Sequence, residues 1–209
     1  MEKITFIIEK AHLSGQSQSL LRKPRFNYYE TERSRKMQKK GRPHVSPERS
    51  DITHQCLMTL LDSPLNKAGK LRIYVRTVDN VLIEVNPAIR IPRTTSRFNG
   101  LIKQLLTNLK IKGTTGDILM KVVKNPVTEY LSPGSIKVGL SQEGVRINKE
   151  NLKLNLSKGY CFYINAIPSG KEDNFENVEC LMKVSDFPLS AALCCGKLCN
   201  MFEELYNIF

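Results

Sequence analysis

Short apolar runs, each bounded by polar or turn-forming residues, alternate along this chain with segments of helical periodicity. The runs have the length and residue types of buried β-strands, whereas the periodic segments place their large apolar residues on one face. The expected strands are Ile4–Ile8, Leu71–Arg76, Val81–Val85, Leu119–Val123, Ile136–Leu140, Gly159–Ile164 and Leu181–Val184. Alternating strands and helices predict an α/β fold.

Periodicity predicts three helices, and a polar turn predicts a hairpin. The helices are expected from a cap at Ser50 or Asp51 to Leu61, from a cap at Thr95 or Ser96 to Leu109, and from the residues after Pro188 to Phe209. Asp79 and Asn80 separate the second and third expected strands, as in a tight two-residue β-hairpin.

The net charge of +12 favours a polyanionic partner, with nucleic acid ahead of an anionic membrane surface. A basic protein with a solvated surface explains the charge equally well. The length of 209 residues fits one domain, or one domain with an insertion, and a hydrophobic content of 41% suffices for a buried core.

Membrane-spanning and metal-binding functions find no support in the sequence. No apolar run approaches the roughly 20 residues that span a bilayer, and Ile4–Ile8 is too short for a signal peptide, so we expect an intracellular protein. The six cysteines form no CxxC pair and the three histidines are scattered, which argues against zinc ligation. We therefore expect reduced, mostly buried cysteines.

Two basic segments are candidates for RNA contact. The stretch at about 23–49 is either an RNA-facing arm or a solvated linker. Arg90, Arg93 and Arg97 precede or begin the second helix, where the helix dipole disfavours each cation by about 0.3–1 kcal/mol. Arginines beside free backbone N–H groups suit phosphate, so we favour anion binding over pairing with carboxylates elsewhere in the fold.

Two loops follow expected strands, Asn165–Lys171 and Val184–Ser190. The first loop lacks the opening glycine of GxxxxGK[ST], and no GxGxxG occurs in the chain. Neither loop therefore matches a known nucleotide-binding motif. A ligand held between loops at strand ends is nevertheless common in α/β proteins. No Ser/His/Asp set indicates nucleophilic catalysis, and the residues alone favour structural roles for His54 and Asp62.

Several segments in one order resemble a known family. They are Asp51–Gln55, Asp62–Asn66, Val81–Pro87, Arg90–Phe98, Lys124–Val127 and Phe187–Leu193. Together they resemble the pseudouridine N1-specific methyltransferases of small-subunit rRNA, the ribosome-biogenesis family of the SPOUT class. The resemblance runs from Ile4 to the C-terminus; no single segment would suffice, but this many in the same order is specific.

The resemblance implies a SPOUT-type α/β fold in a single domain over residues 1–209, with a deep C-terminal trefoil knot, an inserted β-hairpin and a basic variable segment at about 23–49. Such a knot is an exception to the rule that chains do not knot. It also implies a homodimer that uses S-adenosylmethionine. The cofactor residues carried over by position are Leu140, Asn165, Gly170, Val184, Ser185, Asp186, Phe187, Pro188 and Leu189.

The implied activity is methylation of N1 of a pseudouridine in small-subunit rRNA, without a metal and with a role in small-subunit biogenesis. By position, Asp62 accepts or orients the N1 proton and Arg49 stabilises negative charge on the base. Arg49, Arg90, Arg93 and Arg97 would contact the RNA, while Asp51 would pair with Arg49 and cap the helix.

The implied partners are small-subunit rRNA, a second copy of the chain and, as further candidates, subunit assembly factors. The location would be the nucleolus or nucleus in a eukaryote and the cytoplasm otherwise. The main alternative is a non-catalytic rRNA-binding assembly factor, which one feature favours: Asn165 stands where relatives tend to place glycine. A nucleotide hydrolase and a membrane-surface protein are disfavoured by the missing phosphate motif and the lack of a basic amphipathic helix.

Overall fold

A computed structural model describes residues 3–13, 49–154, 156–168 and 174–208. Its strands are β1 (Ile4–Ala11), β2 (Leu71–Thr77), β3 (Leu82–Val85), β4 (Lys110–Lys112), β5 (Ile118–Val123), β6 (Ile136–Arg146), β7 (Tyr160–Asn165) and β8 (Cys180–Lys183). Its helices are α2 (Ser50–Asp62), α3 (Pro64–Lys67), α4 (Thr95–Asn108), η1 (Val127–Tyr130), α5 (Lys149–Leu154) and α6 (Ala191–Tyr206).

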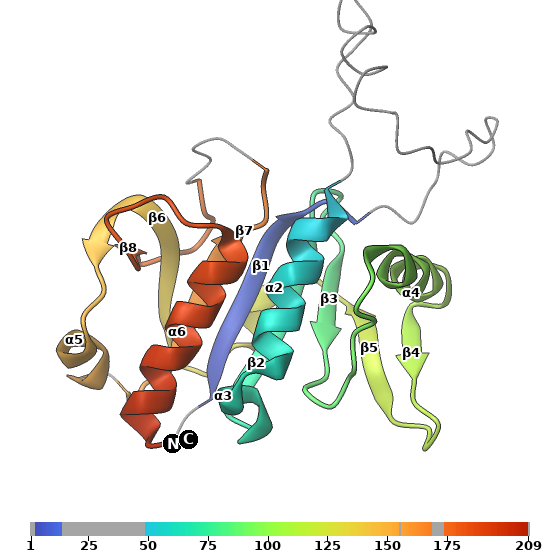
Figure 1. Ribbon diagram of the computed structural model, residues 1–209, viewed down its shortest axis with the longest axis horizontal. Helices are drawn as coiled ribbons and strands as arrows, with labels where there is room; N and C mark the ends of the chain where they lie inside the picture. The colour runs from blue at the N-terminus through green and yellow to red at the C-terminus, as the bar shows by residue number, and fades with distance from the viewer. Residues whose placement is uncertain (1–2, 14–48, 155, 169–173, 209) are drawn as a thin grey trace, which may run out of the picture.

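The strands form one sheet in the order β4-β5-β3-β2-β1-β7-β6-β8 (Figure 1). Strands β2, β1, β7, β6 and β8 pair in parallel, whereas β3, β5 and β4 extend the sheet with antiparallel pairs. The carboxyl ends of the parallel strands therefore meet at one edge, where α/β proteins commonly bind ligands.

Helices α2 and α6 lie side by side on one face of the sheet, and α4 covers the same face at the β4–β5 end (Figure 1). Their apolar stripes close a core with the strands, in which Leu57, Leu60, Phe98 and Phe202 are fully buried. The opposite face carries a smaller core around Ile7, Tyr74, Leu82, Cys161 and Tyr163, packed against the segments near Tyr130 and Phe175.

The α/β class and each strand expected from the sequence are confirmed, although β1 and β6 run further than predicted. The β2–β3 hairpin is also confirmed, but Thr77 N–H bonds to the Val81 carbonyl and Asn80 takes a φ of 58°. The connection is therefore longer than the predicted two residues. The short elements α3, β4, η1 and α5 were not predicted.

The predicted helix caps are wrong by about one residue. The N-cap of α2 is Arg49 and that of α4 is Thr94, and neither side chain accepts a cap hydrogen bond. Ser50 and Asp51 thus lie in the first turn of α2, as Thr95 and Ser96 do in α4. Helix α6 ends at Tyr206 rather than continuing to Phe209, because Asn207 adopts the left-handed conformation.

Two sequence predictions fall outside the described residues: the basic segment at 23–48 and Gly170. Among the described residues, no helix is long and apolar enough to cross a bilayer.

Candidate functional site

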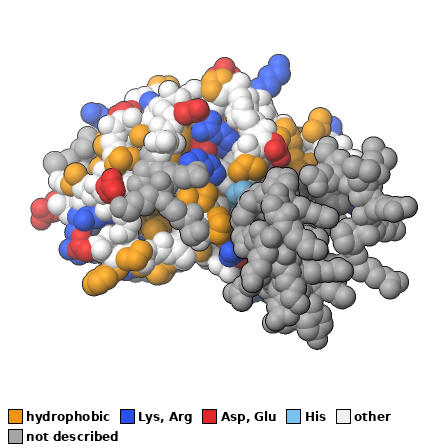
Figure 2. Space-filling view, turned by 90° about the horizontal axis from the view of Figure 1, so that it is seen from above, with side chains coloured by type: hydrophobic (Ala, Val, Ile, Leu, Met, Phe, Trp, Pro, Cys, Tyr) orange, Lys and Arg blue, Asp and Glu red, His pale blue; other side chains and the backbone are white. Residues whose placement is uncertain are grey.

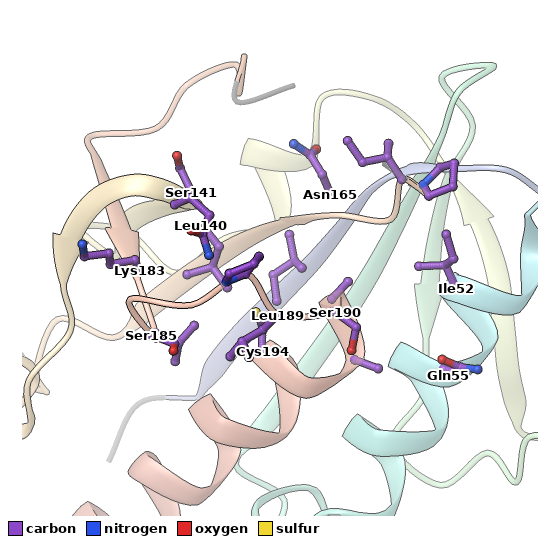
Figure 3. Close-up of a pocket in the computed structure, with 18 of the residues that line it drawn as sticks. Ile52, Gln55, Leu140, Ser141, Asn165, Lys183, Ser185, Leu189, Ser190 and Cys194 are labelled. Atoms are coloured by element: carbon purple, nitrogen blue, oxygen red, sulfur yellow. The ribbon is translucent and has the colours of Figure 1, made fainter. Parts of the chain in front are cut away.

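A cavity of about 520 Å³ opens at the carboxyl edge of the parallel strands. The ends of β6, β7 and β8 form one side of it, and the first turns of α2 and α6 form the other (Figure 3). In the close-up, Leu140 and Ser141 come from β6, Asn165 from the end of β7, Ile52 and Gln55 from α2, and Ser190 from the start of α6. Three strand ends and two helix starts thus converge on one hollow.

A break in the pairing of β6 shapes this hollow. β6 pairs with β8 up to Leu140, and pairing resumes only at Val145, so the residues between them bulge out of the ladder. The Ser141 hydroxyl accepts a hydrogen bond from the Glu143 N–H at 3.0 Å and holds the bulge. Gly144 approaches β8 so closely that a Cβ would lie 2.5 Å from Met182 N, so only glycine fits there.

The loop from β8 to α6 is ordered by its own serines. Ser185 Oγ accepts from the Phe187 N–H at 3.1 Å, and Ser190 Oγ accepts from the Leu193 N–H as the N-cap of α6. Asp186 instead pairs with Lys183 at 3.0 Å and Arg146 at 3.3 Å. The hydrogen bond from Lys183 lowers the pKa of Asp186 below its ordinary value.

Most residues predicted to bind a cofactor lie around the cavity. Leu140, Asn165, Val184, Ser185, Phe187, Pro188 and Leu189 all line it. Asp186 is not among the lining residues. The lining also includes residues that the sequence did not assign to the cofactor, among them Ile52, Gln55, Ser141, Gln142, Lys183 and Cys194. Those next to the predicted loops could have been found by extending each loop into its neighbouring element, but Gln55 depends on the helix packing.

Arg49 and Asp51 lie at the rim of the cavity, at the start of α2. Arg49 donates two hydrogen bonds of 2.9 Å, from Nε and Nη2, to the two carboxylate oxygens of Asp51. The predicted pairing is therefore confirmed, in a bidentate form that fixes the plane of the guanidinium group. The hydrogen bond also raises the pKa of Arg49 and lowers that of Asp51.

Arg90, Arg93 and Arg97 are exposed, and the structure records no ion pair between them and any described carboxylate. Among the described residues, the alternative of pairing with carboxylates finds no support. Viewed from above, Lys and Arg side chains lie next to hydrophobic ones in the middle of the described surface (Figure 2).

His54 holds the arginine segment against α2, a role the sequence did not reveal. Its Nε2 lies 2.7 Å from the Pro92 carbonyl oxygen, which can only accept, so Nε2–H donates. Nδ1 of the same ring lies 3.3 Å from the Thr95 hydroxyl oxygen. The ring stacks on Phe98 at a centroid distance of 4.7 Å. A buried helical histidine looks structural in sequence, and only its partners connect it with the arginines.

Asp62 lies at the opposite end of α2 from Arg49. Twelve residue steps of about 1.5 Å separate it from Ser50, or about 18 Å along the helix. Asp62 lines a separate hollow of about 340 Å³ together with Arg90 and Arg93. Within one chain, the predicted catalytic pair is therefore split, whereas Asp62 and two predicted RNA-binding arginines lie together.

The chemistry of the main cavity suits binding rather than nucleophilic attack. Burial raises the pKa of the Cys194 thiol to about 11, so this cysteine stays protonated near neutral pH. No cluster of metal-ligating side chains occurs in the part of the chain that the structure describes. The lining combines apolar side chains with serine, amide and lysine groups, which fits an organic ligand with both apolar and polar parts.

Comparison with known proteins identifies the family. The model of the EMG1/NEP1 methyltransferase family matches residues 6–203. The chain belongs to this family. It is 45% identical over 178 residues to the ribosomal RNA small subunit methyltransferase NEP1 of Candida albicans, covering 83% of this chain and 66% of that protein. It is also 45% identical over 161 residues to the human protein of that name, covering 77% of this chain and 66% of that protein.

A solved structure shares the fold. The crystal structure of Archaeoglobus fulgidus Nep1 bound to S-adenosylhomocysteine superposes with a TM-score of 0.74 at 21% identity, covering 99% of this chain and 100% of that one. The chain spans about half to two thirds of the length of the first fungal relatives.

The Arg49–Asp51 pair predicts a pH dependence of stability. Because the folded pKa of Asp51 lies below its ordinary 3.8, the pair stabilises the fold above about pH 4 and loses this effect as pH falls further. Both side chains are more than a third exposed, so we expect Asp51→Asn to cost at most about 1 kcal/mol. Thermal unfolding should give a constant Tm difference from about pH 7 to 5 that shrinks towards pH 2. Asp79→Asn, an exposed turn residue, is the control; a pH-independent difference for Asp51→Asn would contradict the assignment.

Proposed function

We propose that this chain is a methyltransferase that uses S-adenosylmethionine to methylate N1 of a pseudouridine in small-subunit rRNA. The observation that carries the proposal is the cavity at the ends of β6, β7 and β8, in a chain of the EMG1/NEP1 family. The relatives are named ribosomal RNA small subunit methyltransferases, and the Archaeoglobus protein was solved with S-adenosylhomocysteine, the demethylated form of the cofactor.

The cavity residues fit this cofactor. The volume of the cavity, about 520 Å³, lies within the usual range for small-molecule sites. Leu140, Ile164 and Leu189 offer apolar surface for an adenine ring, while Ser141 and Lys183 offer groups for polar atoms and a carboxylate. When bound, the cofactor would supply an activated methyl group on a sulfonium, which requires no metal and no covalent enzyme intermediate.

Pseudouridine presents a free N1–H because its sugar is attached through carbon, whereas N1 of uridine carries the sugar. Methylation forms a bond between N1 and the methyl carbon as the methyl–sulfur bond breaks, and the N1 proton must leave to a base. We propose Asp62 as the group that accepts or orients this proton, with Arg49 stabilising negative charge on the ring.

If Asp62 and Arg49 act in one site, their separation along α2 requires that they come from two copies of the chain. If the α2 helices of two subunits run in opposite directions across a two-fold axis, Asp62 of the partner subunit comes close to Arg49 at the rim of the cavity. We propose that the enzyme acts as this dimer and that its site combines residues of both copies.

We further propose that this chain forms one domain with a trefoil knot through the loops after β6 and β7. We also propose that it acts in small-subunit biogenesis together with assembly factors. The parallel order β1-β7-β6-β8, with α6 returning to pack on α2, supports such a threading. In a eukaryotic cell the protein would then work in the nucleolus or nucleus, and otherwise in the cytoplasm.

The decisive experiment is calorimetric titration of the purified protein with S-adenosylmethionine, followed by methyl transfer to a pseudouridine-containing rRNA hairpin and its uridine twin. We expect cofactor binding and transfer to the pseudouridine hairpin alone. Transfer to both hairpins would remove N1 selectivity. RNA binding without cofactor affinity would instead establish a non-catalytic assembly factor, with Asn165 in the cavity wall as the first residue to revert to glycine.

Asp62→Ala should lower turnover by at least 100-fold, the order of a lost general base, with little change in RNA affinity. Single-turnover assays at saturating cofactor would separate the methyl-transfer step from binding. Asp79→Ala removes an exposed carboxylate from the β2–β3 turn and serves as the matched control. Near-normal turnover of Asp62→Ala would eliminate Asp62 as the base.

Arg93→Ala and Arg97→Ala should each weaken RNA binding and lower its dependence on salt, because each lost phosphate contact reduces the slope of log K against log salt by about 0.7–0.9. Titrations at several salt concentrations measure this slope. Lys158→Ala, an exposed cation between β6 and β7, is the control. Slopes equal to that of the wild type would exclude both arginines from the phosphate contacts.

A further inference from the structure

The sheet face opposite to α2 and α6 carries an unusual set of cations on β2, β4 and β5. Leu71, Ile73, Ile111 and Met120 point into the core beneath the helices. Since neighbouring residues of a strand point to opposite faces, the side chains between and beside them emerge on the other face. These are Arg72 on β2, Lys110 and Lys112 on β4, and Lys121 on β5.

Strand register places several of these groups in one row. Lys110 lies directly opposite Lys121, Lys121 opposite Glu84, and Glu84 opposite Tyr74. Like charges directly opposite each other in an antiparallel pair destabilise the sheet. Glu84 pairs with Lys121 at 2.9 Å, which leaves Lys110 without a recorded ion pair to any described residue.

Beside this row lies a hollow of about 400 Å³. Lys3, Arg72 and Lys121 stand along it, and Leu119 and Tyr130 contribute to its lining. Neither Lys3 nor Arg72 has a recorded ion pair with a described residue. The cationic sheet face, defined as Lys3, Arg72, Lys110, Lys112 and Lys121, thus combines cations with a partly apolar depression, and Glu84 is the one carboxylate among the described residues that line this depression.

Protection of an exposed sheet edge accounts for only part of this pattern. Lysines on edge strands prevent strands of other molecules from pairing, and β4 is the edge strand, so Lys110 and Lys112 fit that role. Lys121 and Arg72, however, belong to β5 and β2, which are paired on both sides. The ion pair with Glu84 accounts for Lys121, but neither edge protection nor a recorded ion pair accounts for Arg72, whereas an anionic partner laid across the strands would contact all of these cations.

We propose that the cationic sheet face binds the phosphate backbone of RNA that flanks the target nucleotide. This inference rests on the proposed function, because the flanking RNA belongs to the same molecule as the target. Once the target is bound, its flank is present at a high effective concentration, so modest contacts suffice. Lysine and arginine side chains on a flat surface suit a backbone without reading its sequence.

The test compares two RNAs, the minimal pseudouridine hairpin and the same hairpin with single-stranded extensions at both ends. Lys110→Gln/Lys112→Gln/Lys121→Gln should leave binding and methylation of the minimal hairpin unchanged. For the extended RNA, the wild type should show the steeper salt slope, and the variant should lose about 2 from it, at about 0.7 for each single-strand phosphate contact. Affinity for the extended RNA at low salt should fall by at least tenfold.

Two further variants keep the result interpretable. Lys110→Gln/Lys112→Gln leaves the Lys121–Glu84 pair intact and should show an intermediate loss with unchanged thermal stability. Lys149→Gln/Lys153→Gln/Lys158→Gln removes the same charge from the connection between β6 and β7 and should leave the extended RNA's slope unchanged.

The proposal is overturned if the sheet-face variant binds the extended RNA like the wild type, or if the control variant loses as much. An equal loss on both RNAs also overturns it, because the face would then contact the hairpin or act through general charge. Absence of methyl transfer by the wild type would instead defeat the proposed activity, and it would leave the comparison of the two salt slopes intact.

Discussion

The packing of α2 on the sheet and against α6 at its side is the contact on which the site depends. Cys56, Leu57 and Leu60 are fully buried in it, which fixes both the height and the rotation of the helix. One rigid element thereby carries three functions along its length. Its first turn brings Arg49 to the cavity, its middle holds the arginine segment through His54, and its last turn places Asp62 beside Arg90 and Arg93. Loss of this packing would disturb all three together, because none of these groups is positioned by a loop of its own.

Charge is placed in two contrasting ways around this helix. At the start of α2, Asp51 lies in the first turn, where the helix dipole favours an anion, and it binds Arg49 through two hydrogen bonds. At the start of α4 the charge in the first turn has the opposite sign. This turn has no acidic residue, and Arg97 lies there without a recorded ion pair to a described residue. The first arrangement stabilises the fold by itself, whereas the second becomes favourable when an anion joins it.

The sequence predicted the α/β alternation, the long helices and the strands, because each has a complete apolar period of its own. Through the family resemblance it also predicted seven of the residues that line the cavity, all on the loops that follow β6, β7 and β8 or at their start. The remainder depends on contacts between distant segments. The bulge after Leu140 exists because Gly144 packs on the backbone of β8, and α4 ends because Leu109 turns left-handed into β4. Neither event has a periodic signal, and the links of His54 to Pro92 and Thr95 span about forty residues of sequence.

The cations opposite the helices follow the same physical rule as those at α4. Lys110 faces Lys121 across a strand pair in which Glu84 offsets only the charge of Lys121, just as Arg97 opposes the dipole of its helix. At Lys110 and Arg97, a neutral residue would relieve the local repulsion in the free protein. A basic chain that only needed solubility could carry its charge of +12 at positions without such a cost. Cations kept where the isolated fold disfavours them are what the proposed RNA contacts on both faces of the sheet would require.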